Sequence, residues 1–264
     1  MPPSSPTSSP IPFAAYVQRH AATMPELPLV HTTQCEHLPS IRANHALEPR
    51  QCRVFGEPLL YLFYGRPSYR DCAKTTPVNQ DVAYCPVCFV LKPDSRLALT
   101  RVFPFDTGAF QKGHYEPQVP AGRTLNDFSV PGVIDSARQI VDAFFETNSN
   151  YLASKTRSGL TFTPNEPDAA AYYHLANGGG RQDCDDRRST VEIQCTASAN
   201  LRETLMAVVM PTHFLDDPQL RRTLLDDWRA HPLTYDVDQG MRPTEFHGII
   251  RKLIRDYYHG WRFI

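Results

Sequence analysis

Hydrophobic positions along the chain fall into short, separate runs, which predict many small elements. Two runs, residues 59–64 and 84–91, are continuous and rich in aromatic and branched side chains, and this is typical of buried strands. Residues 189–196 alternate instead, so Val191, Ile193 and Cys195 are expected to face the core. The predicted strands are residues 29–31, 59–64, 84–91, 101–105, 189–196 and 205–210.

Helices are predicted where apolar residues recur at intervals of three or four. The clearest stripe covers residues 134–147. Thr33 and Glu36 have the spacing of a capping box, which assigns Thr33 to a helix start with Pro39 in an early turn. The other predicted helices are residues 13–24, residues 39–47, one that begins at Asp217 and Pro218, and one that Thr244 caps.

These elements predict an α+β fold, because strands are spread along the whole chain without regular βαβ alternation. Residues 110–131 and 148–189 contain few apolar runs and are expected to be loops. Residues 1–12 are rich in proline and serine and are expected to form a flexible tail. Residues 13–264 then form one domain.

Composition narrows the class of protein. Hydrophobic residues make up 41% of the chain, and 27 basic side chains nearly balance 28 acidic ones. This balance leaves no global field to attract nucleic acid. No apolar run reaches the roughly 18 residues of a membrane span, and the N-terminus lacks the pattern of a signal peptide. With seven scattered cysteines, the sequence predicts a soluble cytoplasmic protein with reduced thiols and no membrane partner.

Three features occur in an order that indicates a family. A His-x-Thr triplet begins at His31, an aromatic strand ends in Gly65-Arg66-Pro67, and Glu192 lies on a late strand. In this order they resemble ADP-ribosyltransferases, and the DarT-like group most closely. The likeness covers roughly residues 29–69 and 189–211. It implies a single domain with a central split sheet, antiparallel or mixed, that is flanked by helices and takes NAD as a substrate.

By this resemblance Glu192 is the catalytic residue. Cleavage of the bond between nicotinamide and ribose develops positive, oxocarbenium-like charge, and a carboxylate beside the ribose stabilises that transition state. The same carboxylate can orient or deprotonate the acceptor group. Gln194 follows Glu192 by two residues, whereas the paired motif of the family places the catalytic glutamate second.

The resemblance also assigns the residues that bind NAD. A histidine holds a ribose hydroxyl, a threonine hydroxyl faces the ligand, a tyrosine ring stacks on the nicotinamide and an arginine grips the pyrophosphate. In this sequence they are His31, Thr33, Tyr61 or Tyr69, and Arg53, with Arg50 and Arg66 as alternatives to Arg53.

The partners that the resemblance implies are a macromolecular acceptor, nucleic acid or protein, and an antitoxin-like protein if the chain is a bacterial toxin or anti-phage effector. The loop of residues 178–188 would contact the acceptor. A non-catalytic binding module with the same fold is the alternative. An enzyme needs Glu192 in a cleft with His31, whereas a module tolerates it facing solvent.

Two short motifs suggest other chemistry. Cys85 and Cys88 have zinc-knuckle spacing, so a small zinc-containing interaction protein is a further alternative. No second pair follows, and without one they are interpreted as small buried hydrophobes, which predicts no metal site. The segment from Asp106 to Ala109 matches an aspartic protease motif, which requires two copies. With a single copy, a turn in which Asp106 bonds its own backbone is the simpler interpretation.

Overall fold

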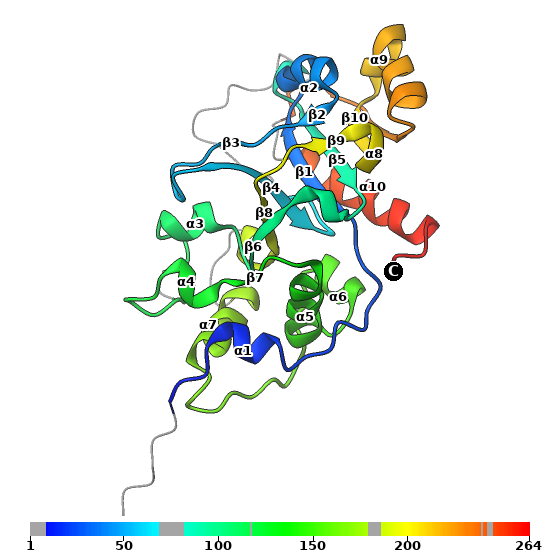
Figure 1. The fold of residues 1–264 in the computed structure, drawn as a ribbon. Coiled ribbons are helices and arrows are strands. Elements are labelled where there is room, and N and C mark those ends of the chain that lie inside the picture. The colour runs from blue at the N-terminus through cyan, green and yellow to red at the C-terminus, as the bar shows by residue number, and fades with distance from the viewer. Residues whose placement is uncertain (1–8, 69–81, 117, 179–185, 239, 242–244) are drawn as a thin grey trace, which may run out of the picture.

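A large mixed β-sheet runs through the molecule, with helices on its flanks (Figure 1). The protein is described by a computed structural model that covers residues 9–68, 82–116, 118–178, 186–238, 240–241 and 245–264. The α+β class predicted from the sequence is therefore confirmed. Among the described residues, none of the helices has both the length and the apolar character needed to cross a lipid bilayer.

The sheet has the strand order β11-β10-β5-β1-β4-β8-β6-β7, and β3 pairs with the other end of β4. Of the described strand pairs only β10 and β11 are parallel. A separate small sheet joins β2 (Ala46–Leu47) to β9 (Ala199–Asn200). The strands of the large sheet are β1 (Leu29–Gln34), β3 (Arg50–Gln51), β4 (Pro58–Tyr64), β5 (Pro86–Leu91), β6 (Leu99–Phe103), β7 (Val130–Pro131), β8 (Glu192–Cys195), β10 (Leu205–Pro211) and β11 (His231–Tyr235).

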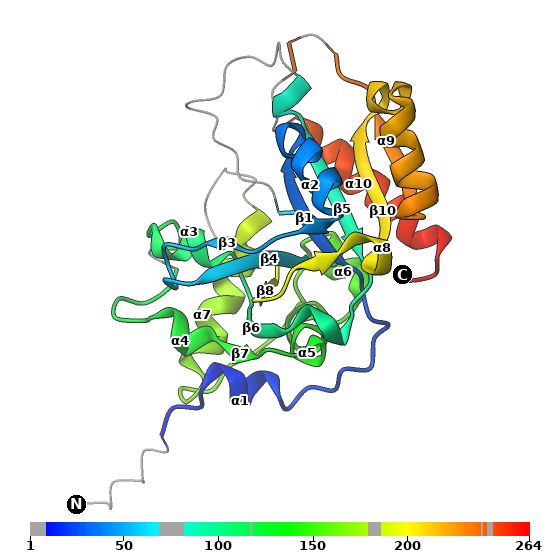
Figure 2. The same cartoon turned by 45° about the horizontal axis from the view of Figure 1, so that its top comes forward.

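The sheet splits at its centre, between β1 and β4. Strand β1 pairs with β5 along all six of its residues, but it pairs with β4 only at Leu29 and Val30. From His31 onward the two strands part. The half of the sheet that contains β1, β5 and β10 then runs in a clearly different direction from the half that contains β4 and β8 (Figure 2). This separation leaves room for side chains between the two halves.

Helices pack on both halves of the sheet. Helix α10 (Phe246–Gly260) lies beside β10 and β11, and α5 (Ile134–Phe145) lies beside β6 (Figure 1). The apolar stripe predicted for 134–147 is buried, as its residues from Ala137 to Phe145 show. The remaining helices are α1 (Phe13–Val17), α2 (Leu38–Asn44), α3 (Thr107–Gln111), α4 (Leu125–Phe128), α6 (Asn148–Leu152), α7 (Pro167–Ala176), α8 (Leu201–Thr204) and α9 (Pro218–Arg222).

The end of one predicted helix and the predicted cap of another were wrong. The helix expected over residues 13–24 ends at Val17, because the residues that follow, 18–24, are largely exposed and bury no apolar face. The capping box expected at Thr33 and Glu36 is absent, because β5 pairs with β1 as far as Gln34 and keeps Thr33 in a strand.

The segments expected to be loops also contain structure. Residues 110–131 include α4 and β7, and residues 148–189 include α6 and α7. Helix α7 begins with Pro167 and buries Tyr172 in a cluster of rings with Phe13 and Phe144. Of the predicted tail, residues 1–8 lie outside the described residues, and the Ile11 N–H donates to the Asn165 carbonyl at 2.6 Å.

Arg66, one of the three arginines considered for the pyrophosphate, is buried and forms hydrogen bonds with other segments of the fold. Its side chain is 2% exposed and donates hydrogen bonds to the hydroxyls of Thr190 and Ser189 and to the Tyr151 carbonyl. Its guanidinium also lies over the Tyr151 ring at 4.7 Å. A side chain with these contacts joins the end of β4 to α6 and to the start of β8, and it is not free to bind a ligand.

Candidate functional site

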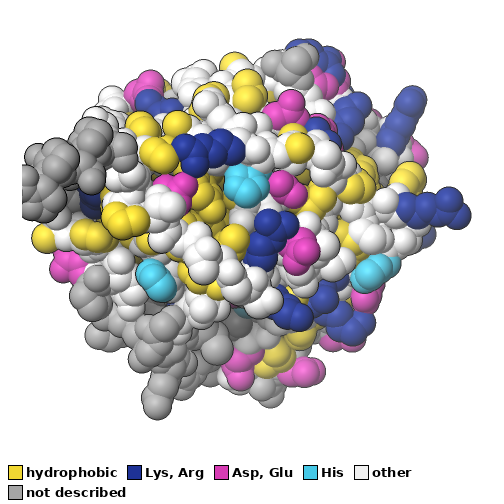
Figure 3. Space-filling model, turned by 90° about the horizontal axis from the view of Figure 1, so that it is seen from below, with side chains coloured by type: hydrophobic (Ala, Val, Ile, Leu, Met, Phe, Trp, Pro, Cys, Tyr) yellow, Lys and Arg dark blue, Asp and Glu magenta, His cyan; other side chains and the backbone are white. Residues whose placement is uncertain are grey.

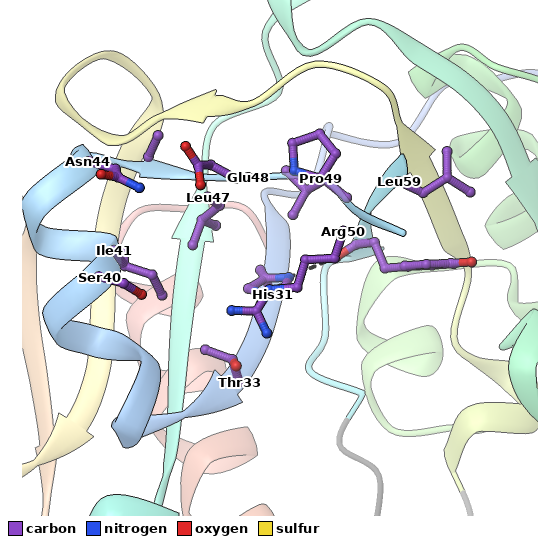
Figure 4. Close-up of a pocket in the computed structure, with 13 residues that line it drawn as sticks. His31, Thr33, Ser40, Ile41, Asn44, Leu47, Glu48, Pro49, Arg50 and Leu59 are labelled. Carbon is purple, nitrogen blue, oxygen red and sulfur yellow. Dashed lines mark hydrogen bonds between the residues drawn. The ribbon is translucent and has the colours of Figure 1, made fainter. Parts of the chain in front are cut away.

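A pocket opens where β1 and β4 part. It is bounded by β1, α2, the connection from Ala46 to Arg50, and β4, and it has a volume of about 210 Å³ (Figure 4). Three residues predicted to bind NAD line it, namely His31, Thr33 and Tyr61. They come from two strands that separate in space, so the split in the sheet brings them together.

The His31 ring is held in one orientation. Its Nδ1 lies 2.9 Å from the Tyr61 carbonyl oxygen, which can only accept a hydrogen bond, so Nδ1 carries the proton. Burial lowers the pKa of His31, although the bond to the Tyr61 carbonyl opposes this, and the ring is therefore neutral near pH 7. Its Nε2 is then an acceptor, and no described residue bonds it. A ligand hydroxyl is a suitable donor for this atom.

Tyr61 is fixed at both ends. Its backbone carbonyl accepts from His31, and its hydroxyl lies 2.7 Å from the Cys52 thiol on the turn between β3 and β4. Burial raises the pKa of Tyr61, with a further contribution from the Cys52 hydrogen bond, so the phenol is neutral. Tyr61 is also one of the residues that line the pocket.

Arg50 lines the pocket, whereas Arg53, the arginine preferred from the sequence for the pyrophosphate, is not among its lining residues. Arg50 belongs to β3, which pairs with β4, and its side chain lies beside His31 above Thr33 (Figure 4). Arg53 follows in the turn after β3, is exposed, and is not among the lining residues. Strand pairing thus directs the earlier arginine toward the pocket. Tyr69 lies outside the described residues.

Glu192 is buried beside the pocket and is not one of its lining residues. It begins β8, is 1% exposed, and lies directly across from Phe63 on β4 and Phe103 on β6. Strand register places Gln194 across from Tyr61, so Glu192 and Tyr61 are diagonal neighbours on one face of the sheet. Tyr61 therefore has His31 and Glu192 as neighbours, the first through its backbone carbonyl and the second on the same face of the sheet.

Three donors hold the Glu192 carboxylate. The Thr107 backbone N–H donates at 3.0 Å, the Thr107 hydroxyl at 2.7 Å and the Gln194 side-chain amide at 2.8 Å. Burial is the main cause that raises the pKa of Glu192 to about 8, and the nearby Asp106 carboxyl adds to this, while the three donors act in the opposite direction. With this pKa, the neutral form of the Glu192 carboxyl predominates at pH 7, and the charged form becomes the major one only above pH 8.

The hydrogen bonds that Thr107 and Gln194 donate to Glu192 were not predicted from the sequence. Thr107 lies in the motif that resembles an aspartic protease, where Asp106 caps α3 by accepting the Ala109 N–H at 2.7 Å. The predicted Asp106 turn is confirmed, and the same turn aims Thr107 at Glu192. The sequence does show a threonine directly after a capping aspartate. It does not show that this threonine bonds Glu192, which lies 85 residues further along the chain.

The described cysteines are buried. Cys85 and Cys88 are both fully buried, and the Thr32 hydroxyl donates to the Cys88 sulfur at 3.5 Å. Burial raises the pKa of Cys88 to about 12, so its thiol is protonated. Within the described ranges, no group of three or more His, Cys, Asp or Glu side chains is placed to hold a metal ion. Cys72 and Cys184 lie outside those ranges.

Two comparisons with known proteins identified no related protein. No protein-family model matches the chain, and a search of curated proteins finds no significant match.

The buried Glu192 predicts how stability depends on pH. Its folded pKa of about 8 lies above the ordinary value of 4.5, so its contribution to stability is complete below pH 4.5 and is lost as the pH rises through 8. We expect the free energy of unfolding, measured with urea, to fall by a few kcal/mol from this group between pH 4.5 and pH 8.

The matched variant is Glu192→Gln, which has the same shape and no charge. We expect the pH dependence of unfolding in this variant to lack the Glu192 component, while the components from histidines and other carboxyls remain. Equal pH dependence in the two proteins would show that Glu192 is ionised in the folded state throughout this range.

Proposed function

We propose that the protein is an NAD-dependent ADP-ribosyltransferase with a DarT-like fold, which transfers ADP-ribose to a macromolecular acceptor. One observation carries the proposal, namely that the sheet splits between β1 and β4 and that His31, Thr33 and Tyr61 line the pocket that this creates. These residues belong to the triplet and the aromatic strand on which the resemblance to the family rests.

The chemistry of the pocket suits one end of a dinucleotide. The Nε2 of His31, which no described residue bonds, accepts from a ribose hydroxyl, the Thr33 hydroxyl adds a second polar contact, and Arg50 supplies a cation for a phosphate. At about 210 Å³ the pocket is smaller than the roughly 300–1,000 Å³ of sites that enclose a drug-sized ligand. We therefore place part of NAD in the pocket and the remainder outside it.

Glu192 is the proposed catalytic residue. In the reaction, the bond between ribose C1′ and nicotinamide breaks with its electron pair on nicotinamide, and the acceptor nucleophile bonds to the same carbon and loses a proton. An ionised Glu192 stabilises the positive charge that develops on the ribose. Because Glu192 is 1% exposed, contact between Glu192 and a substrate requires the residues that cover it to move.

The proposed partners are an acceptor that meets the loop of residues 178–188 and, for a toxin acting in the cytoplasm, an antitoxin-like protein. Residues 179–185 of this loop lie outside the described residues. On the face shown in Figure 3, positive and negative side chains are interspersed among the described residues. Such a surface favours an acceptor bound by a few local contacts over broad binding to duplex DNA, which depends on many phosphate contacts.

A nucleotide-binding module without turnover is the second candidate. It is favoured by the burial of Glu192 and by the three hydrogen bonds that already satisfy its carboxylate. Both candidates use the His31 pocket, and they differ only in whether Glu192 reaches the ligand.

Turnover of NAD separates the two candidates. We expect nicotinamide release by the purified protein and a loss of about 100-fold or more in Glu192→Ala, because the variant cannot stabilise the charge on the ribose. NAD affinity, measured by calorimetry, is the control and is expected to change little. Binding without release from either protein, in the presence of nucleic acid and protein extracts as acceptors, would favour the module. Absence of NAD binding would overturn both candidates.

Arg50 and Arg53 provide a matched pair for the phosphate contact. They lie three residues apart on the same exposed segment, but only Arg50 lines the pocket. We expect Arg50→Met to weaken NAD binding about 10-fold, the loss of one charge-assisted hydrogen bond, and Arg53→Met to change it less than about twofold. Equal effects of the two variants would place the phosphates elsewhere.

A further inference from the structure

A chain of polar side chains leads from the surface to Glu192. Glu57, on the turn before β4, forms an ion pair with Arg101 on β6. Arg101 Nε donates to the Gln194 side-chain oxygen at 2.7 Å, and the Gln194 side-chain nitrogen donates to Glu192 Oε1 at 2.8 Å. Gln194 is fully buried and Glu57 is partly exposed, so the chain joins solvent to the core through two strands.

Arg101 determines which way the Gln194 amide points. A guanidinium has only donors, so the amide must present its oxygen to Arg101 and its NH₂ group to Glu192. If the amide were reversed, its oxygen would face a carboxylate oxygen and its NH₂ group would face the guanidinium. Both contacts would be repulsive, and the side chain of Gln194 is buried where water cannot relieve them.

Arg101 is itself held in place. Its guanidinium lies over the Phe55 ring at 4.3 Å while it pairs with Glu57, and both residues belong to the segment between β3 and β4. The same segment carries Cys52, whose thiol meets the Tyr61 hydroxyl. One short hairpin thus supports Tyr61 in the pocket and, through Arg101, the amide that bonds Glu192.

The other groups around Glu192 come from two further elements. Asp106 and Thr107 face it from the start of α3, and Tyr61 approaches from β4. Asp106 opposes the charge on Glu192, and the two Thr107 donors favour it. Among the described residues, the hydrogen bonds and ion pair of Arg101 are to Gln194 and Glu57, so replacing Arg101 removes no hydrogen bond of Asp106, Thr107 or Tyr61.

We propose that Arg101 is a positioning residue that acts through Gln194, turning the Gln194 amide so that its NH₂ group holds Glu192 in position and favours its ionised form. That Glu192 then acts on a substrate rests on the proposed function. We call this action of Arg101 on Glu192 through the Gln194 amide the relay. It is a property of the protein alone, so its test needs no NAD.

The test measures the ionisation of Glu192 directly. Protein labelled with ¹³C at glutamate side-chain carboxyls is titrated by NMR, and the Glu192 signal is the one that Glu192→Gln removes. We expect Arg101→Met to raise the titration midpoint of Glu192 by about one pH unit, because the freed amide can turn its oxygen toward the carboxyl. Arg96→Met is the matched control, since Arg96 is exposed and pairs with Asp94 and Glu203 on the surface.

The same substitution in a Gln194→Leu variant distinguishes the relay from a direct effect of the Arg101 charge on the titration of Glu192. In Gln194→Leu protein the relay is already broken, so adding Arg101→Met should leave the midpoint unchanged. A rise of the same size in both backgrounds would mean that the Arg101 charge acts on Glu192 directly, and would overturn the proposal. So would an unchanged midpoint in Arg101→Met alone.

Arg101→Gln serves if Arg101→Met does not fold, because an amide at this position can offer either a donor or an acceptor to Gln194. The same rise is expected. If the protein turns over NAD, the acidic limb of the pH profile of kcat should move by the same amount while KM changes little. Failure of turnover would refute the proposed function and leave the NMR result to decide the relay.

Discussion

The hydrogen bond from His31 to the Tyr61 carbonyl is the interaction on which the site depends. It forms where the pairing of β1 with β4 ends, and it joins the two strands through a side chain just beyond that point. By occupying Nδ1, it fixes the tautomer of a neutral ring and turns an acceptor nitrogen toward the pocket. His31 thus lies at the split in the sheet and also supplies a polar group to the pocket.

Glu192 illustrates the cost of placing a carboxylate inside a sheet. Burial favours its neutral form, and the donors from Thr107 and Gln194 oppose that preference. The result is a group whose charge responds to small changes in its neighbours. Environments that raise a pKa in this way are frequent at catalytic carboxylates, and they also occur around buried carboxyls with a structural role. A measurement of NAD turnover distinguishes the two roles.

The parts of the fold that follow from local pattern were predictable from the sequence. The strand at residues 59–64, the helix that begins at Pro218 and the capping role of Asp217 all appear where the sequence places them. The parts that depend on distant partners were not. Thr33 has the spacing of a helix cap, but it is kept in a strand because Val87, far along the chain, pairs with it.

The candidate site shows the same division. His31 and Tyr61 were predictable because each lies in a recognisable local pattern, and the structure brings them to one pocket. Choosing Arg50 over Arg53 required knowledge of how β3 pairs with β4. The partners of Glu192 were equally hidden, since Thr107 lies 85 residues away and belongs to a motif with another resemblance.

The most direct measurement is a crystal structure of the protein with an NAD analogue whose bond between ribose and nicotinamide cannot break. We expect a ribose hydroxyl within hydrogen-bonding distance of His31 Nε2, about 2.6–3.2 Å, and a phosphate in contact with the Arg50 guanidinium. An analogue bound away from this pocket, with Nε2 of His31 left without a ligand partner, would contradict it.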